Sequence, residues 1–289
     1  MESDLFLERM VKVTILTGSE LRHSFVRKYL ALSPGIEVVL SICEGTQKSL
    51  HARVKLQAEP GDLRLDHLEE RQQSEDDLFG AYVRRAPDRS NPVSIAQGAI
   101  NDDKVVEMIV NTAPDLVVAY GPSLIRGPLL SQFASRFLNV HLGLSPYYRG
   151  SGTNYWPLVK GQPEYVGATF MLMDEGIDTG QIIHQLRARV YPGDTPHLIG
   201  NRLIHDVALV YGAIIANFNT LQTMTTPPKP MTEFFYKQMD FTVDSLLELR
   251  QRFNSGLVAT YLQEREARCA VVPIIENPGV PPLRALMQI

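Results

Sequence analysis

Two polar side chains close an apolar segment near the middle of the chain. In NVHLGLSPYYRGSGTNYW (139–156), Asn139 and His141 are separated by a single residue. If this segment begins as a strand, both side chains project from the same face, because successive side chains alternate faces. An Asn amide donates hydrogen bonds, and an imidazolium donates and can also release a proton near neutral pH. The pair therefore suits an oxygen that gains negative charge while a carbonyl is attacked, as in an oxyanion hole.

A carboxylate-rich loop offers a partner for this histidine. The segment MDEGIDTGQ (173–181) contains Asp174, Glu175 and Asp178 next to two glycines. An adjacent carboxylate raises the pKa of a histidine and orients its ring. We assign this role to Asp178.

Ordinary structural roles also explain these groups. An Asn-x-His pair at a strand end is more often a turn-capping pair, and Asp178 fits an Asx-turn equally well on local grounds. His197 and His205 do not have the spacing of a helical metal pair, so we expect no metal site. The histidines outside the pair are scattered and are interpreted as structural or surface residues: His23, His51, His67, His184, His197 and His205.

The surrounding segments alternate between strand and helix patterns. The runs VKVTILTG (11–18) and IEVVLSIC (36–43) are rich in β-branched residues, and the apolar residues between them recur at helical spacing. This order predicts an α/β fold, with a Rossmann-like, mainly parallel twisted sheet flanked by helices. Ligands of such sheets bind beyond the carboxyl ends of the strands. Further strands are expected at 116–120 and 137–141, in GATFMLMDEG (167–176) and in GQIIHQLRARV (180–190).

Several helices are expected between and after these strands. Asn101 is predicted to cap a helix that runs to about Asn111. The strongly charged stretch 60–90 indicates a solvated helix or excursion. Other helices are expected at 128–133, at about 195–223, and at 242–262, where the apolar residues lie on one side.

A proline-rich stretch divides the chain of 289 residues. TTPPKP (225–230) has three prolines in six residues and is the best candidate for a linker. We therefore expect a catalytic domain over 1–224 and a small C-terminal extension over 225–289. The residues leave open whether this extension forms part of a substrate pocket or the interface of a homodimer.

Composition limits the cellular setting and the partners. The net charge of −4 and the pI near 6.0 argue against an extended phosphate-binding surface, so nucleic acid is not an expected partner. No uninterrupted apolar run approaches the roughly 20 residues of a membrane span, and the N-terminus lacks the pattern of a signal peptide. Cys43 and Cys269 are far apart and outside any C-x-x-C pattern. We expect a cytoplasmic protein with reduced thiols and no membrane partner.

Three segments, in this order along the chain, resemble a known family. VVAYGPSLI (117–125), LNVHLGLSPYYRGSGTNYW (138–156) and MLMDEGIDTGQII (171–183) are similar to the folate-dependent formyltransferases. That family includes methionyl-tRNA formyltransferase, glycinamide ribonucleotide transformylase and the sugar N-formyltransferases. The resemblance covers about 11–205 and is densest over 115–183.

The resemblance implies direct formyl transfer, in which an acceptor amine attacks the formyl carbonyl of 10-formyltetrahydrofolate. It makes Asn139, His141 and Asp178 the catalytic residues, the same three that the strand-end argument selects. It also implies that two segments bind the pterin of the folate, and their residues are Gly121, Ser123, Leu124, Ile125, Asp174, Glu175, Gly176 and Ile177.

The acceptor is the less determined part of the reaction. After the histidine, many family members have Ser-Leu-Leu-Pro, whereas this chain has GLSP (143–146), followed by Tyr147 and Arg149 on the expected acceptor side. The turn at Ser19, with Arg22 and His23, would offer a phosphate site at a helix N-terminus. An ordinary strand-to-helix turn with a solvated arginine explains that segment equally well.

We expect a small amine acceptor, phosphorylated in the leading interpretation. The C-terminal tail resembles formyltransferase-like proteins linked to the amino sugars of surface polysaccharides, which favours a nucleotide-linked amino sugar. Aminoacyl-tRNA is the second possible acceptor, although only about sixty residues follow the linker. The sequence is also compatible with a catalytically silent folate-binding protein and with a hydrolase that releases formate from formyl-folate.

Overall fold

The structure is a computed structural model that describes residues 10–47, 49–225 and 232–288. The predicted linker at 225–230 lies outside the described residues except for Thr225.

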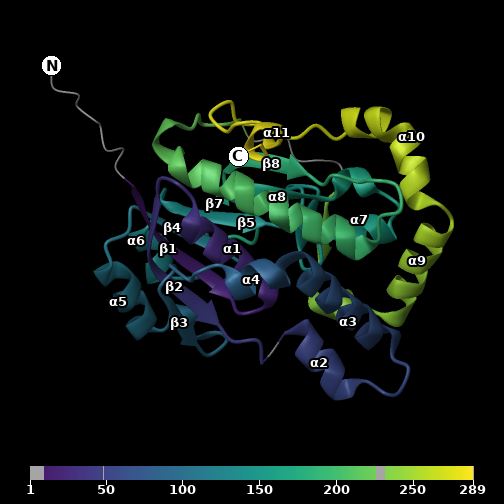
Figure 1. Cartoon of the computed structure of the whole chain (residues 1–289), viewed down its shortest axis with the longest axis horizontal. Helices are drawn as coiled ribbons and strands as arrows, with labels where there is room; N and C mark the ends of the chain where they lie inside the picture. Colours follow the sequence, from purple (N-terminus) through teal and green to yellow (C-terminus); the bar gives the residue numbers. More distant parts are fainter. Residues whose placement is uncertain (1–9, 48, 226–231, 289) are drawn as a thin grey trace.

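Seven strands form one sheet in the order β3–β2–β1–β4–β5–β7–β8 (Figure 1). The strands from β3 to β5 run parallel, whereas β7 is antiparallel to both β5 and β8. The mainly parallel, helix-flanked sheet confirms the predicted fold class. The strands are β1 (Val11–Gly18), β2 (Ile36–Glu44), β3 (Pro92–Ile95), β4 (Leu116–Tyr120), β5 (Phe137–His141), β7 (Gly167–Leu172) and β8 (Ile182–Arg187).

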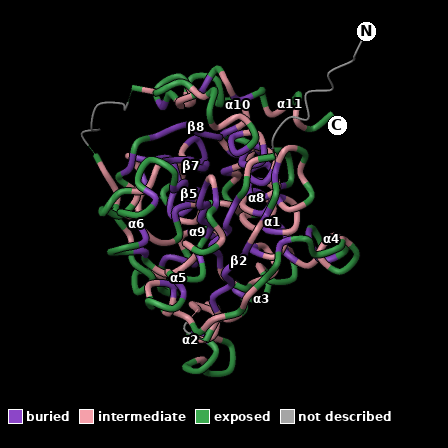
Figure 2. The backbone as a smooth tube through the Cα atoms, turned by 90° about the vertical axis from the view of Figure 1, so that its left-hand side faces the viewer, coloured by how far each residue is buried: buried purple, intermediate pink, exposed green. Residues whose placement is uncertain are grey.

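Helices cover both faces of the sheet because its strands are apolar on both sides. In β1, Val13 and Ile15 belong to the core under α1 (Leu21–Leu32) and α8 (Pro196–Ala216). Leu16 belongs to a second core under α5 (Asp103–Asn111) and α6 (Pro128–Gln132). Figure 2 shows this buried layer running through the centre of the molecule between the helices.

The long helix α8 is apolar because it crosses the larger core. Among the described residues, it is the one helix whose length and composition would suffice to span a membrane. About two thirds of its most apolar window (67%) is buried inside the protein, as in the core helix of a globular domain.

Helix boundaries differ from the predictions at three places. Asp102 occupies the N-cap of α5, while the predicted cap, Asn101, turns its side chain to the loop after β4. Helix α8 ends at Ala216 and does not reach 223. The predicted helix 242–262 is two helices, since Gly256 adopts a left-handed φ of 83° between them.

The charged stretch 60–90 contains α3 (Leu63–Glu75), which continues through a π-helical turn at 76–80 into α4 (Ala81–Arg85). Helix α2 (Leu50–Gln57) precedes it. Only a few side chains of α3 are buried, among them His67 and Leu68, in keeping with its sparse apolar stripe. The predicted solvated helix is therefore present.

The segment after the linker packs on the rest of the chain. Its strand β9 (Phe234–Tyr236) pairs in parallel with β6 (Tyr148–Gly150), and the ring of Tyr236 stacks on Trp156 with centroids 4.1 Å apart. Helix α9 lies beside α7 (Figure 1), so long-range contacts hold this segment in place. The remaining helices are α7 (Trp156–Val159), α9 (Val243–Asn254), α10 (Leu257–Ala270) and α11 (Leu283–Leu286).

Candidate active site

Asn139 and His141 lie at the carboxyl end of β5, as predicted for a strand end. Strand β5 runs between β4 and β7, with Asn139 opposite Ala119 and His141 opposite Thr169. Both side chains line one cavity of about 830 Å³. His141 is only 8% exposed, whereas Asn139 is half-buried. The pair therefore presents hydrogen-bond donors to the cavity.

Both ring nitrogens of His141 face oxygens that accept hydrogen bonds. Nδ1 lies 3.3 Å from Oδ1 of Asp178, and Nε2 lies 3.1 Å from the carbonyl oxygen of Tyr148. A carboxylate and a carbonyl are both hydrogen-bond acceptors, so each can take a hydrogen bond from an N–H of the ring. The ring is thus oriented from two sides.

Asp178 reaches His141 because the loop between β7 and β8 folds back over β5. Asp178 itself has a left-handed φ of 53°, and its Oδ2 accepts a hydrogen bond from the backbone N–H of Gly150 at 3.1 Å. The Asx-turn of this loop is made by Asp174 instead, whose Oδ1 accepts from the N–H of Gly176 at 3.0 Å. Asp178 is therefore held toward the histidine by the backbone of β6.

Two glycines permit the close contacts around this pair. A Cβ on Gly143 would lie 2.5 Å from Nε2 of His141. Gly150 has a left-handed φ of 86°, and a Cβ there would collide with the carbonyl oxygen of Tyr236. Glycine at 150 thus lets β9 approach the strand that fixes Asp178.

The cavity opens where the order of the strands reverses, between β1 and β4, the usual ligand position in such sheets. The structure brings most of the predicted folate-binding residues into its wall: Gly121, Ser123, Leu124, Ile125, Asp174, Gly176 and Ile177. Glu175 does not line the cavity.

A buried carboxylate that the sequence analysis did not select holds the part of the wall that contains the predicted folate-binding residues. Glu44, at the end of β2 and 2% exposed, accepts hydrogen bonds from the N–H groups of Gly98 and Ser123. Asn101 binds the same loop, because it donates to the carbonyl oxygen of Leu124 at 2.9 Å. Its position at the end of a strand is the sequence signal that could have identified Glu44 as a residue of the site.

Of the predicted acceptor residues, Arg22 and His23 line the cavity and three others do not. Ser19 is exposed, and the ring of Tyr147 packs against Tyr165. Arg149 forms an ion pair with Glu233 and donates to the carbonyl oxygen of Ile177 at 3.3 Å. Its guanidinium is thus engaged away from the cavity.

Arg22 is paired with carboxylates and is not a free cation. Its guanidinium contacts Glu20 and lies 2.8 Å from Oε1 of Glu75 on α3. Burial alone would lower the pKa of Arg22, but Glu75 and Glu20 outweigh that effect and raise it. An anion at this position would compete with both carboxylates.

His23 lies beneath the same turn and is uncharged. Its Nδ1 accepts a hydrogen bond from the N–H of Glu20 at 3.2 Å, and the ring fills the space beside Gly18 and Gly121. Burial lowers the pKa of His23 well below its usual range, and the charges of Arg22 and Arg71 add to the effect.

The C-terminal segment also contributes to the wall of the cavity. Its lining residues, which sequence reasoning did not select, are Phe235, Tyr236, Lys237, Gln238 and Phe241. They reach the cavity through the pairing of β9 with β6, a contact for which the sequence offers no local signal.

Comparison with known proteins agrees with this architecture. Residues 45–211 match the family model described as Formyl transferase. Among curated proteins, the chain is similar to the methionyl-tRNA formyltransferase of Desulforamulus reducens, with 39% identity over 93 residues, which are 32% of this chain and 29% of that protein. The chain spans less than half of the length of the curated relatives that it matches.

Two solved structures share the fold at low sequence identity. One is glycinamide ribonucleotide transformylase 1 from Symbiobacterium toebii, with a TM-score of 0.52 and 20% identity over 79% of this chain and 96% of that one. The other is a sugar N-formyltransferase from Shewanella sp FDAARGOS_354, with a TM-score of 0.52 and 20% identity over 83% and 87%.

Proposed function

The chain belongs to the formyl transferase family, and from this premise we propose that it transfers a formyl group from 10-formyltetrahydrofolate to an amine of a small acceptor. The observation that carries the proposal is the contact between His141 and Asp178 in the wall of a cavity that Asn139 also lines. Three groups suited to one carbonyl chemistry thus face a common space.

The cavity suits a folate donor. Its volume of about 830 Å³ lies in the upper part of the range of small-molecule sites. Among the described residues, the buried Oδ1 of Asn154 and the hydroxyl of Tyr120 lack hydrogen-bond partners, and both residues line the cavity. The loops 121–125 and 174–177 would hold the pterin. When bound, 10-formyltetrahydrofolate supplies an electrophilic formyl carbon.

The three catalytic residues divide two tasks in this proposal. Asn139 and His141 donate hydrogen bonds to the formyl oxygen as it gains negative charge, which lowers the barrier to attack. Asp178 keeps the ring oriented through Nδ1 and balances its positive charge. The carbonyl oxygen of Tyr148 holds Nε2 until a ligand competes for that N–H.

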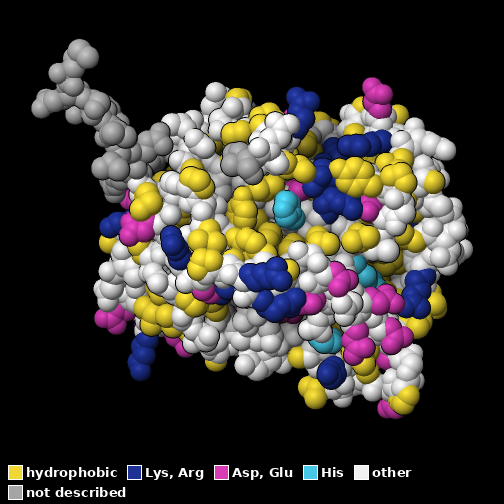
Figure 3. All heavy atoms as spheres, in the orientation of Figure 1, with side chains coloured by type: hydrophobic (Ala, Val, Ile, Leu, Met, Phe, Trp, Pro, Cys, Tyr) yellow, Lys and Arg dark blue, Asp and Glu magenta, His cyan; other side chains and the backbone are white. Residues whose placement is uncertain are grey.

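We propose a nucleotide-linked amino sugar as the acceptor. The support is that Tyr236, Lys237 and Phe241 from the C-terminal segment add a wall to the cavity, whose volume of about 830 Å³ suits a small molecule. The net charge of −4 also favours this acceptor over a polynucleotide. On the face drawn in Figure 3, basic side chains are interspersed with acidic ones over the described residues.

An aminoacyl-tRNA acceptor is the second candidate, because the curated relatives with 31–41% identity over part of their length are methionyl-tRNA formyltransferases. With that acceptor, the exposed ring of Phe235 and Lys237 would face the terminal nucleotides of the tRNA.

The test is a turnover assay with 10-formyltetrahydrofolate and a panel of nucleotide-linked amino sugars, amino acids and initiator methionyl-tRNA. Tetrahydrofolate release and the masses of the products are followed together. A formylated amino sugar is the expected product. Formation of formyl-methionyl-tRNA would instead support the second candidate acceptor. Tetrahydrofolate release without a formylated acceptor would identify a hydrolase. Folate binding without any turnover would leave a binding protein.

A further inference from the structure

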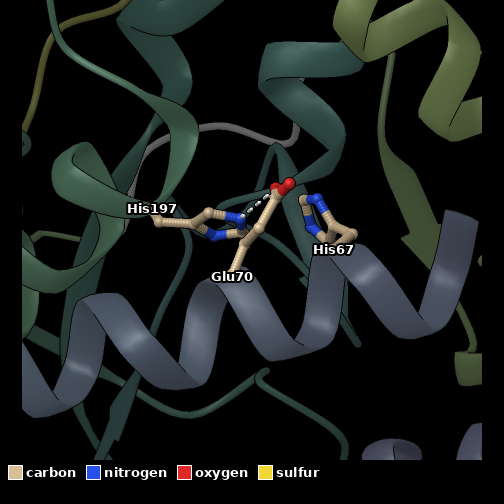
Figure 4. A group of neighbouring side chains, drawn as sticks. All are labelled: His67, Glu70 and His197. Carbon is tan, nitrogen blue, oxygen red and sulfur yellow. Dashed lines mark ion pairs between the residues drawn. The ribbon is translucent and has the colours of Figure 1, made fainter.

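Two histidines and a carboxylate from distant parts of the chain meet at the edge of the cavity. His67 and Glu70 rise from the same side of α3, and His197 faces them from the first turn of α8 (Figure 4). The positions 67 and 70 are one helical turn apart, so their side chains share a face. His67 and His197 also line the active-site cavity.

The donor atoms of the three side chains converge. Nε2 of His197 lies 3.7 Å from Oε2 of Glu70, and one ligand atom from each residue lies within 4.8 Å of the other two. Ligands of a tetrahedral zinc ion are separated by roughly 3.3 Å, given bonds of about 2.0–2.1 Å. Small side-chain rotations would close the site, and Glu70, with a side chain 59% exposed, is free to make them.

Burial prepares both imidazoles to act as ligands. It lowers the pKa of His67 to about 3, assisted by His197, Arg71 and Arg250. It lowers the pKa of His197 to about 4, assisted by Arg71. What supports ligation is the geometry, because a ring nitrogen of each histidine and a carboxylate oxygen of Glu70 lie within 4.8 Å of one another.

Two arginines, Arg71 and Arg250, place positive charge near the cluster. Arg250 of α9 lies 4.0 Å from Oε1 of Glu70, and Arg71 lies 3.6 Å from Oε1 of Glu75. The contact between Arg250 and Glu70 is long and exposed, so it costs little to break. A dication bound by Glu70 would replace Arg250 as the partner of that carboxylate.

We propose that His67, Glu70 and His197 bind one Zn²⁺ ion and thereby tie α3 to the start of α8. Two neutral imidazoles and one carboxylate are a ligand set that zinc uses in proteins, with the fourth position open to water or a ligand. The ring centroids of Tyr155 and Phe241 lie 5.7 and 5.8 Å from that of His67. Because both rings pack against His67, fixing its ring with an ion would also order this wall of the cavity. The site does not depend on formyl transfer.

The experiment titrates Zn²⁺ into the full chain, free of chelators and of any histidine tag, by calorimetry and thermal unfolding. One ion per chain is expected, with a rise in Tm of about 5 °C at a hundredfold excess over Kd. Co²⁺ provides a spectroscopic probe, because its visible absorption reports nitrogen and oxygen ligation at this site.

Matched variants locate the ion. Glu70→Gln and His197→Gln are each expected to weaken Zn²⁺ binding by at least about tenfold. Their controls, Glu69→Gln and His205→Gln, change side chains outside the cluster on the same two helices and are expected to bind Zn²⁺ as the unaltered chain does. Arg250→Gln is expected to strengthen binding, because it removes a positive charge beside Glu70.

Three results would overturn the proposal: no Zn²⁺ binding, unchanged binding by both Glu70→Gln and His197→Gln, or a response to Mg²⁺ alone, since that ion prefers oxygen ligands. If His197→Gln does not unfold cooperatively, Glu70→Gln alone decides the test. Glu70 is exposed, so its substitution leaves the core intact.

Discussion

Two buried histidines line the same cavity, yet their surroundings are opposite. His141 is 8% exposed and His23 is 7% exposed. Both nitrogens of His141 face acceptor oxygens, whereas Nδ1 of His23 accepts a backbone N–H and its neighbours include arginines. The first environment accepts hydrogen bonds from the ring, whereas the second donates one to it and, through burial and the nearby arginines, lowers the pKa of His23.

We propose that this difference separates a corner that performs the chemistry, around His141, from a corner that packs the fold and contacts the acceptor, around His23. The environment of His141 comes from β5, β6 and the loop after β7, all inside the matched family region. That of His23 depends on contacts with α3, such as the pair between Arg22 and Glu75. We expect substitutions in the first corner to change turnover and those in the second to change acceptor affinity or stability.

The largest effect is expected at the oxyanion donors. His141→Ala or Asn139→Ala should reduce kcat by about 10²–10³-fold or more, because each removes a donor to the developing charge. Single-turnover assays with saturating donor measure the loss, and thermal unfolding shows whether the fold survives. Near-normal turnover by either variant would remove its assignment and with it the contrast with His23.

A loss of about 10²-fold in kcat is expected for Asp178→Asn. The amide keeps the shape of the side chain but no longer balances a positive charge on His141, 3.3 Å away. The pH dependence of kcat should change together with its magnitude, which a purely structural role would not cause. Glu175→Gln, in the same loop but outside the cavity wall, is the control and should retain an unaltered pH profile.

The residues proposed for the chemistry could be selected from sequence because each stands in a recognisable local pattern, although the contact between His141 and Asp178 depends on the fold. The alternation of a strand places Asn139 and His141 on one face, and a glycine-bounded loop supplies Asp178. Most of the sheet could be predicted for the same reason, since β-branched runs and helical spacing appear within short windows. Neither pattern indicated that β7 and β8 run antiparallel, because that depends on which edge of the sheet the chain returns to.

Other contacts around the cavity could not be predicted because they join distant positions in the sequence. The sequence suggests a free cation at Arg22, but Glu75, fifty-three residues further along the chain, pairs with it. Local pattern favours a helix cap at Asn101, which instead binds the loop that contains Leu124. The pairing of β9 with β6 and the meeting of His67 with His197 follow only from the folded topology.

Gly150→Ala tests the contact between β6, which holds Asp178, and β9 of the C-terminal segment. The substitution strains a φ of 86° and forces a Cβ against the carbonyl oxygen of Tyr236, so β9 should separate from β6. We expect a loss of about 1–3 kcal/mol in the free energy of unfolding and weaker acceptor binding. Gly193→Ala is the control, since its φ of 81° is similar but its Cβ would meet no atom within 4 Å. Equal effects would mean that strain alone, without the contact to β9, accounts for the loss.

Arg22→Ala should raise the KM for a phosphorylated acceptor by about tenfold, with folate binding unchanged. Glu75→Gln leaves Arg22 with Glu20 alone and is expected to lower that KM, because one competing carboxylate is gone. Steady-state kinetics with phosphorylated and unphosphorylated acceptors separates the two effects. Unchanged affinity for every phosphorylated acceptor would reject a phosphate site at this turn.

The last expected effect concerns stability alone and arises from the protonation of His23. Its pKa in the folded protein lies well below the usual value of 6.5, so below pH 6.5 the unfolded chain binds a proton that the folded chain does not. The free energy of unfolding should therefore fall as the pH decreases below 6.5, by up to about 1.4 kcal/mol per pH unit for this one group. In His23→Gln that share of the slope should disappear, whereas His205→Gln, a change at a half-exposed ring, should retain it. Denaturant unfolding at a series of pH values measures the slopes, and identical slopes in all three proteins would show that His23 accepts a proton without unfolding, which would end the contrast with His141.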